Sequence, residues 1–241
     1  MNTTELISLS SSVAAFITSG IALFNVIELN KQRKQSLIPE IIFKEASFSI
    51  FNGKNSPIPI KWLAINKDID ITGDFALECF NIGLGSAKNL NLSWSYDIKA
   101  IIEIIHKNNN EKVYQIDYDE KSQFVNIKMK NGGLSATKLD LQSKSEYILP
   151  ASAHKEPTKF RLPTSYHYLC SILLDLFFDY TADEEIAQLL NWPPLRLELV
   201  YEDVAGKKYK RKIVFNPKVF FVIQREDDSE PCARGYFEVS Y

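Results

Sequence analysis

The chain has 241 residues, of which 45% are apolar, and this is enough for one hydrophobic core of moderate size or two small ones. Lys+Arg 28 against Asp+Glu 30 leaves a net charge of -2, so there is no overall basic field that would draw the protein to nucleic acid. Only 9 Gly and 10 Pro exclude a collagen-like or low-complexity chain. Cys79, Cys170 and Cys232 lie far apart and cannot all pair, which favours a reducing compartment over a disulfide-stapled exterior domain.

The amino terminus contains an uncharged run of 22 residues from Leu6 to Ile27. As an α-helix it would extend about 33 Å, against about 30 Å for the apolar core of a bilayer. Eleven of its residues are Leu, Ile, Val or Phe, which favour insertion. We therefore predict a transmembrane helix over residues 1–30. The alternatives are a cleaved signal peptide, although no basic residue precedes Leu6 and no Ala-x-Ala site ends the run, and a buried amphipathic helix of a soluble domain.

Basic residues follow the span directly: Lys31, Arg33 and Lys34. We expect residues 31–37 to form a basic juxtamembrane linker. Because no base precedes the span, the positive-inside rule predicts an outside amino terminus and a cytoplasmic location for the bulk of the chain.

Small and hydroxyl-bearing residues recur along one side of the predicted helix. They are Ser8, Ser11, Ala15, Thr18, Ser19, Ala22 and Asn25. In lipid, helices associate where small residues let backbones approach and polar groups bond across the interface, so this face predicts self-association or docking of another helix. Alternatively, each hydroxyl bonds to a carbonyl one turn earlier and the helix stays alone. A further hypothesis is that several such helices enclose a polar path through the membrane.

Residues 38–241 carry a pattern typical of one β-rich domain. Alternation is clearest from Leu90 to Ile98, and Gly, Asn and Asp mark turns between apolar runs. The predicted strands are 41–51, 75–82, 90–98, 113–118, 124–129, 147–149, 195–201, 208–215, 219–223 and 236–241. Short strands of this kind predict a mainly β fold, an antiparallel β-sandwich of immunoglobulin-like layout with one or two inserted helices.

The helical insertion is expected near residues 165–190. Residues 165–179 carry an apolar stripe, but their uncharged run is too short for a second span, so a core-facing helix is favoured. Residues 182–190 predict a short helical arm, and residues 98–107 suit either a helix or a continued strand.

The sequence shows no pattern of a catalytic or metal site. His106, His154 and His167 lack the spacing of zinc ligands, and no G-x-S-x-G nucleophile elbow occurs. Residues 83–88 resemble a phosphate loop but lead into an alternating strand, which favours a turn. We therefore expect no catalytic residue, metal, cofactor or small-molecule substrate.

Two charge clusters lie in the β-rich domain. The basic one comprises Lys207, Lys208, Lys210, Arg211 and Lys212, and the acidic one Asp175, Asp179, Asp183, Glu184 and Glu185. The basic cluster fits anionic lipid headgroups, a nucleic-acid backbone or a solvated strand whose lysines discourage aggregation. The acidic cluster fits a basic partner or a solubilising face.

Four segments carry a resemblance to known proteins. They are the Ser-rich span, Lys31-Gln32-Arg33-Lys34, Asn81-Ile82-Gly83-Leu84-Gly85-Ser86-Ala87 and the hairpin from Tyr201 to Tyr209. The layout resembles bacterial membrane-anchored proteins, among them the membrane effectors carried beside retrons and other anti-phage systems. The resemblance implies a bacterial inner-membrane toxin that damages the membrane when a phage is sensed.

Three functions are consistent with these features, and we predict the first, with the second as its alternative. The first is a non-enzymatic effector of antiviral defence, whose cytoplasmic domain is held by a protein or ribonucleoprotein partner while its helix perturbs the bilayer on activation. The second is a structural or adaptor subunit that tethers a cytoplasmic complex to the membrane. The third is a membrane-tethered hydrolase.

Overall fold

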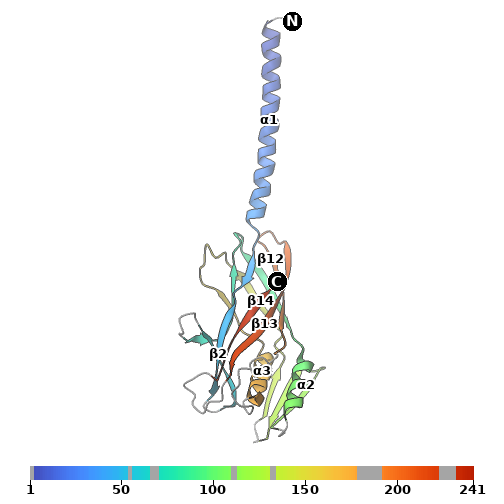
Figure 1. Ribbon diagram of the computed structural model, residues 1–241. Coiled ribbons are helices and arrows are strands. Elements are labelled where there is room, and N and C mark those ends of the chain that lie inside the picture. Colours follow the sequence, from blue (N-terminus) through green and yellow to red (C-terminus); the bar gives the residue numbers. More distant parts are fainter. Residues whose placement is uncertain are drawn as a thin grey trace.

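The computed structural model describes residues 3–53, 56–65, 71–109, 113–130, 134–177, 192–222 and 232–241. Figure 1 shows a long helix, α1 (Thr3–Ser36), that stands away from a β-rich body, with α2 and α3 at the end of the body remote from it. The prediction of a mainly β chain with an apolar amino-terminal helix is confirmed.

The body is built on an eight-stranded antiparallel sheet of order β10-β6-β12-β13-β14-β2-β3-β4. Its strands are β2 (Ala46–Gly53), β3 (Ser56–Ile65), β4 (Ile71–Asp74), β6 (Ala87–Ser95), β10 (Gln142–Ile148), β12 (Leu195–Glu202), β13 (Lys208–Val222) and β14 (Ala233–Ser240). Two three-stranded antiparallel sheets complete the described part. One contains β1 (Ile41–Phe43), β5 (Leu77–Asn81) and β11 (Thr158–Phe160), and the other β7 (Tyr114–Asp119), β8 (Phe124–Met129) and β9 (Leu134–Lys138). The immunoglobulin-like layout stays a prediction.

The core follows the predicted alternation of the strands. In β6, Leu90, Leu92 and Trp94 are buried and the residues between them are exposed. The β1-β5-β11 sheet packs on the large sheet through Phe43, whose ring lies 5.3 Å from that of Phe215. This edge-to-face aromatic contact stabilises the packing of β1 against β13.

Two helices lie at the remote end of the body (Figure 1). α2 (Ile98–Asn108) begins at Asp97, whose carboxylate accepts the Ala100 N–H at 3.0 Å, so the helical alternative for this segment is confirmed. α3 (Thr164–Phe177) is almost wholly buried and packs on α2 and β3, as predicted for a core-facing helix. The predicted arm 182–190 lies outside the described residues.

Two strand predictions need correction, and a third is decided between its alternatives. The run 41–51 forms two strands in different sheets, because the chain crosses from β1 to β2 at the exposed Lys44 and Glu45. The runs 75–82 and 90–98 suit either a hairpin or a strand-loop-strand corner, and the structure has the corner, because the two strands belong to different sheets. The runs 208–215 and 219–223 form one strand, β13, which continues through Pro217. Pairing of β13 with β12 ends at Phe215, so the missing N–H of Pro217 removes no bond to β12.

The α1 helix also extends further than the expected span. The residues 31–36, expected to form a linker, continue the helix, because Lys, Gln and Arg favour helix and no breaker occurs before Pro39. Its segment Val13–Arg33 is long and apolar enough to span a membrane, and the body of the protein buries none of it.

Candidate functional site

The segment that joins α1 to the β-rich body is residues 37–43, which we name the anchor junction. It begins with the exposed Leu37 and Ile38, turns at the buried Pro39 and continues into β1. Proline disfavours helical geometry for the residue before it, so the helix ends here. The contacts described below hold the chain directly after this end of α1.

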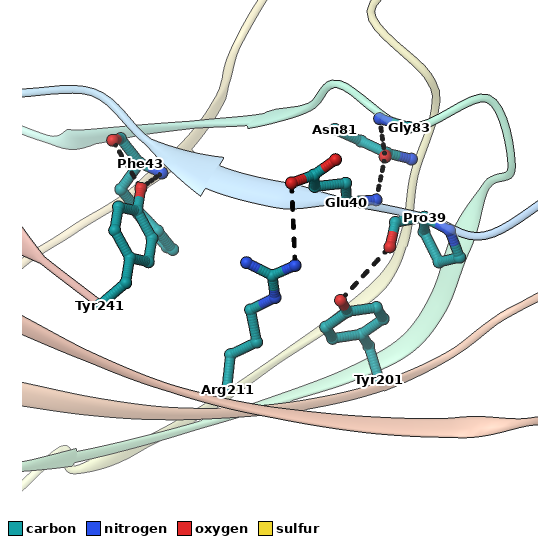
Figure 2. Close-up of polar contacts among 8 residues, drawn as sticks. All are labelled: Pro39, Glu40, Phe43, Asn81, Gly83, Tyr201, Arg211 and Tyr241. Atoms are coloured by element: carbon teal, nitrogen blue, oxygen red, sulfur yellow. Dashed lines mark hydrogen bonds and ion pairs between the residues drawn. The ribbon is translucent and has the colours of Figure 1, made fainter.

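Asn81, at the end of β5, binds the anchor junction with a fully bonded side chain (Figure 2). Its Oδ1 accepts the N–H groups of Glu40 at 3.0 Å and Gly83 at 3.1 Å. Its Nδ2 donates to the carbonyls of Gly85 at 2.7 Å and Ile148 at 3.2 Å. With only 1% of its surface exposed, this amide replaces the hydrogen bonds that water would otherwise supply to all four backbone groups.

Two glycines let the corner after Asn81 approach the anchor junction closely. A Cβ on Gly83 would lie 2.4 Å from the carbonyl oxygen of Ile38, and one on Gly85 would lie 1.7 Å from that of Leu37. The Ile82 N–H also donates to the Glu40 carbonyl at 2.8 Å. The Asn81–Ala87 segment thus forms a turn leading into β6, as predicted, and its glycines are required by contact with residues about 45 positions earlier in the chain.

Side chains from the large sheet and the carboxyl terminus hold the other side of the anchor junction (Figure 2). The Tyr241 hydroxyl accepts the Phe43 N–H at 2.7 Å and donates to the Phe43 carbonyl at 2.9 Å. The Tyr201 hydroxyl donates to the Pro39 carbonyl at 3.4 Å, and Arg211 Nη2 lies 4.0 Å from Glu40 Oε1. Burial raises the pKa of Tyr201 and of Tyr241 above the usual value, so both hydroxyls keep the protons that they donate.

The β12–β13 hairpin, next to this site, is closed by Asp203. Its Oδ1 accepts the N–H groups of Ala205 and Lys207, both at 2.9 Å, and its Oδ2 accepts the Tyr209 hydroxyl at 3.0 Å. Burial alone would raise the pKa of this carboxyl, but the three donors and the Lys207 charge hold it below its usual value. Gly206, at φ +86°, completes the turn. The predicted hairpin is confirmed.

Exposed apolar side chains gather around the anchor junction. We name as the apolar rim Leu37, Ile38, Ile82, Leu84, Leu149 and Val204. Leu84 is 65% exposed, Ile82 51% and Val204 49%. The loops that carry them are tied together: Asn81 bonds Ile148, and Lys88 Nζ donates to the Val204 carbonyl at 3.2 Å. The exposed apolar residues of these loops therefore lie close to the anchor junction.

The predicted association face of α1 is exposed where the structure describes it. Thr18 Oγ1 donates to the Ala14 carbonyl at 2.7 Å and Ser19 Oγ to the Ala15 carbonyl at 2.9 Å, so both hydroxyls are bonded within the helix. This is the bonding expected of an isolated helix. Ala15, Ala22 and Asn25 are exposed, whereas the side chains of Ser8 and Ser11 lie outside the described residues.

The predicted basic groups are divided by the fold. Lys31 and Arg33 are exposed near the end of α1, and the side chain of Lys34 is outside the described residues. In the hairpin, Lys210 Nζ lies 2.6 Å from Glu198, Lys208 Nζ lies 3.9 Å from Glu202, and Arg211 faces Glu40. Along the strands of the hairpin, basic side chains therefore face acidic partners. Lys207, at the turn, is the lysine nearest in sequence to the exposed Val204.

The acidic cluster and the cysteines show no sign of a functional site among the described residues. Asp175 accepts a hydrogen bond from the Tyr114 hydroxyl, and the other members of the acidic cluster lie outside the described residues. All three cysteines are buried and free, and burial raises the pKa of Cys79 and of Cys232 to about 12. Among the described residues, no three His, Cys, Asp or Glu side chains gather as metal ligands would.

The sequence patterns did not identify Asn81, Tyr201 or Tyr241 as functional positions. The Asn-x-Gly-x-Gly spacing indicates a turn, but the contact of this turn with the end of α1 depends on tertiary folding.

Comparison of the chain with protein-family models, curated proteins and solved structures finds no match.

Proposed function

We propose that the protein is anchored in the bacterial inner membrane by a single transmembrane helix. It acts by binding, as a structural or adaptor subunit that holds a protein or ribonucleoprotein partner, together with its own β-rich body, at that membrane. The single observation that supports it best is the anchor junction, in which Asn81, Tyr201 and Tyr241 hold the chain just after an exposed, apolar α1. A helix with no packing partner in the described body leaves its apolar surface for lipid.

The orientation in this proposal rests on charge. Lys31 and Arg33 are exposed at the end of α1 that meets the body, and the buried free cysteines suit a reducing compartment. The body then lies in the cytoplasm and the amino terminus outside. The polar network around the anchor junction binds the chain to the body within seven residues of the end of α1, so the connection between them is short.

The test is the membrane association of the full chain after alkaline extraction. The double variant Ile17→Arg/Ile21→Arg places two charges in the span, each opposing insertion by about 2.5 to 3.5 kcal/mol. We expect the native chain to stay in the membrane pellet and the double variant to move to the soluble fraction. Gln32→Arg, which adds a charge beyond the uncharged run, is the matched control and should stay in the pellet. Native chain recovered wholly in the soluble fraction would refute the anchor.

As a second candidate function, we propose the membrane effector of an anti-phage defence system. What favours it is the face of α1 that presents Ala15, Ser19 and Ala22, which are small and exposed. Such residues let helices approach closely in lipid. In this function the partner restrains the body, and released chains associate through α1 and perturb the inner membrane.

A dye that reports membrane potential separates the two functions. Expression without the partner should depolarise cells if the protein is an effector and leave the potential unchanged if it is an adaptor. The triple variant Ala15→Leu/Ser19→Leu/Ala22→Leu should abolish depolarisation because leucine holds the backbones apart. Its control, Leu23→Ile/Val26→Ile, changes apolar residues without adding bulk to the small face. Depolarisation that persists in the triple variant would exclude helix association as the cause.

A further inference from the structure

The apolar rim has features of a surface that meets lipid. Its members come from four separate parts of the chain, residues 37–38, the 81–86 corner, the end of β10 and the β12–β13 turn. Soluble surfaces carry scattered exposed hydrophobic residues, whereas a group of them at one end of a molecule marks an interaction site. Here the group surrounds the point from which a membrane-spanning helix would emerge.

The charges beside the apolar rim favour an anionic surface. Lys207 and Lys208 are exposed at the hairpin turn, and Lys31 and Arg33 are exposed on the last turns of α1. Of the acids beside them, Asp203 accepts three hydrogen bonds within its turn and Glu40 faces Arg211. Glu202 accepts a hydrogen bond from Asn89 and lies 3.9 Å from Lys208 Nζ, a long and exposed ion pair that contributes little. Exposed lysines around apolar side chains are the composition that binds headgroups of acidic phospholipids.

The length of α1 sets the geometry of such contact. From Ile27, where the uncharged run ends, to Leu37 the helix rises about 15 Å, and the headgroup layer is about 5 to 8 Å thick on each side of the core. Moving the helix inward by one turn, about 5 Å, brings the apolar rim within a side chain's length of the headgroups. Lys31 and Arg33 then reach back to the phosphates, as long basic side chains do near helix ends.

We propose that the apolar rim, with Lys207 and Lys208, is a docking surface for the headgroup layer of the leaflet that α1 leaves, and that it prefers anionic phospholipid. The inference rests on the proposed membrane anchor and deepens it, because it fixes how the body lies on the membrane. The hydrogen bonds that hold the anchor junction keep the rim next to the point where α1 ends.

The experiment uses the full chain reconstituted in vesicles of phosphatidylcholine, with or without phosphatidylglycerol. The variants Leu84→Cys and Val204→Cys each add one exposed cysteine, which is labelled with an environment-sensitive fluorophore while the three native cysteines stay buried. Lys121→Cys is the control, since it lies in the β7–β8 turn, which Glu120 ties to Lys99 of α2 at the remote end. Ile21→Cys reports insertion of α1. Quenchers are lipids spin-labelled at the headgroup or along the acyl chain, and aqueous iodide.

We expect headgroup quenchers to quench labels at 84 and 204 but not at 121, with acyl-chain quenchers acting at 21. Quenching at 84 and 204 should be stronger with phosphatidylglycerol, and the ratio of docked to undocked protein should fall about five-fold for each of Lys207→Gln and Lys208→Gln. Lys212→Gln, on the strand, is the matched control and should change it little.

The other outcomes overturn the docking surface in distinguishable ways. If position 21 is quenched and positions 84 and 204 behave like 121, the anchor stands and the docking surface does not exist. If labels at 84 and 204 are shielded from iodide but not quenched by lipid, and shielding grows with protein density, a second copy covers the apolar rim. If position 21 is not quenched either, the membrane anchor itself fails.

Discussion

Replacing Gly85 with alanine should detach the anchor junction from the body. The new Cβ would lie 1.7 Å from the Leu37 carbonyl oxygen, and the obstacle is backbone, which cannot rotate away as a side chain can. Segment 37–40 must move, and with it the Glu40 N–H that Asn81 accepts at 3.0 Å. We expect the free energy of unfolding to fall by about 3 kcal/mol, the sum of overpacking and a lost, partly buried hydrogen bond.

The measurement is urea unfolding of the full chain in detergent micelles, followed by tryptophan fluorescence. Gly20→Ala is the matched control, because nothing lies within 4 Å of its Cβ position and alanine suits a helix. Limited trypsin digestion at Lys31 to Lys34 should also accelerate in Gly85→Ala and not in Gly20→Ala. Equal unfolding midpoints for the two variants would show that the corner does not hold residues 37–40 in solution.

The sequence predicts local features of this site better than its assembly. Gly83 and Gly85 indicate a turn, and Asp203 with Gly206 indicates a hairpin, because each feature depends on residues a few positions apart. The role of Asn81 could not be predicted, since two of its four partners, Glu40 and Ile148, lie in segments that only pairing between distant strands brings close. Tyr241 contacts Phe43 across 198 positions for the same reason.

The limits of the strand predictions have similar physical causes. The alternation in β6 predicts a strand with one buried face, and this prediction is confirmed. The run from Ile41 to Phe51 is largely apolar, so the sequence gives no sign that the chain crosses from one sheet to another within it. β3 was not predicted, since Pro57 and Pro59 at its beginning indicate a loop when read locally. The apolar rim was also missed, because its members gather only when four segments meet.

Replacing Phe48 with alanine should destabilise the body more than any exposed substitution. Phe48 is fully buried, and its ring stacks on Trp62 at 4.9 Å and Trp192 at 6.1 Å and meets Phe237 at 5.5 Å. These contacts join β2, β3 and β14 in one aromatic cluster. Removal of the ring leaves a cavity that rigid neighbours cannot fill, so we expect the free energy of unfolding to fall by about 3 to 5 kcal/mol.

Phe220→Ala is the matched control, since that ring, on β13, is 60% exposed and its loss should change the free energy of unfolding by about 0.5 kcal/mol. Urea unfolding reports both variants, and Trp62 and Trp192 place the fluorescence signal inside the cluster itself. The midpoint should shift with an unchanged m-value if Phe48 acts only through packing. A changed m-value would instead mean that the cluster persists in the unfolded chain. A loss of unfolding free energy equal to that of Phe220→Ala would mean that the stacked rings do not hold β2 to β3 and β14.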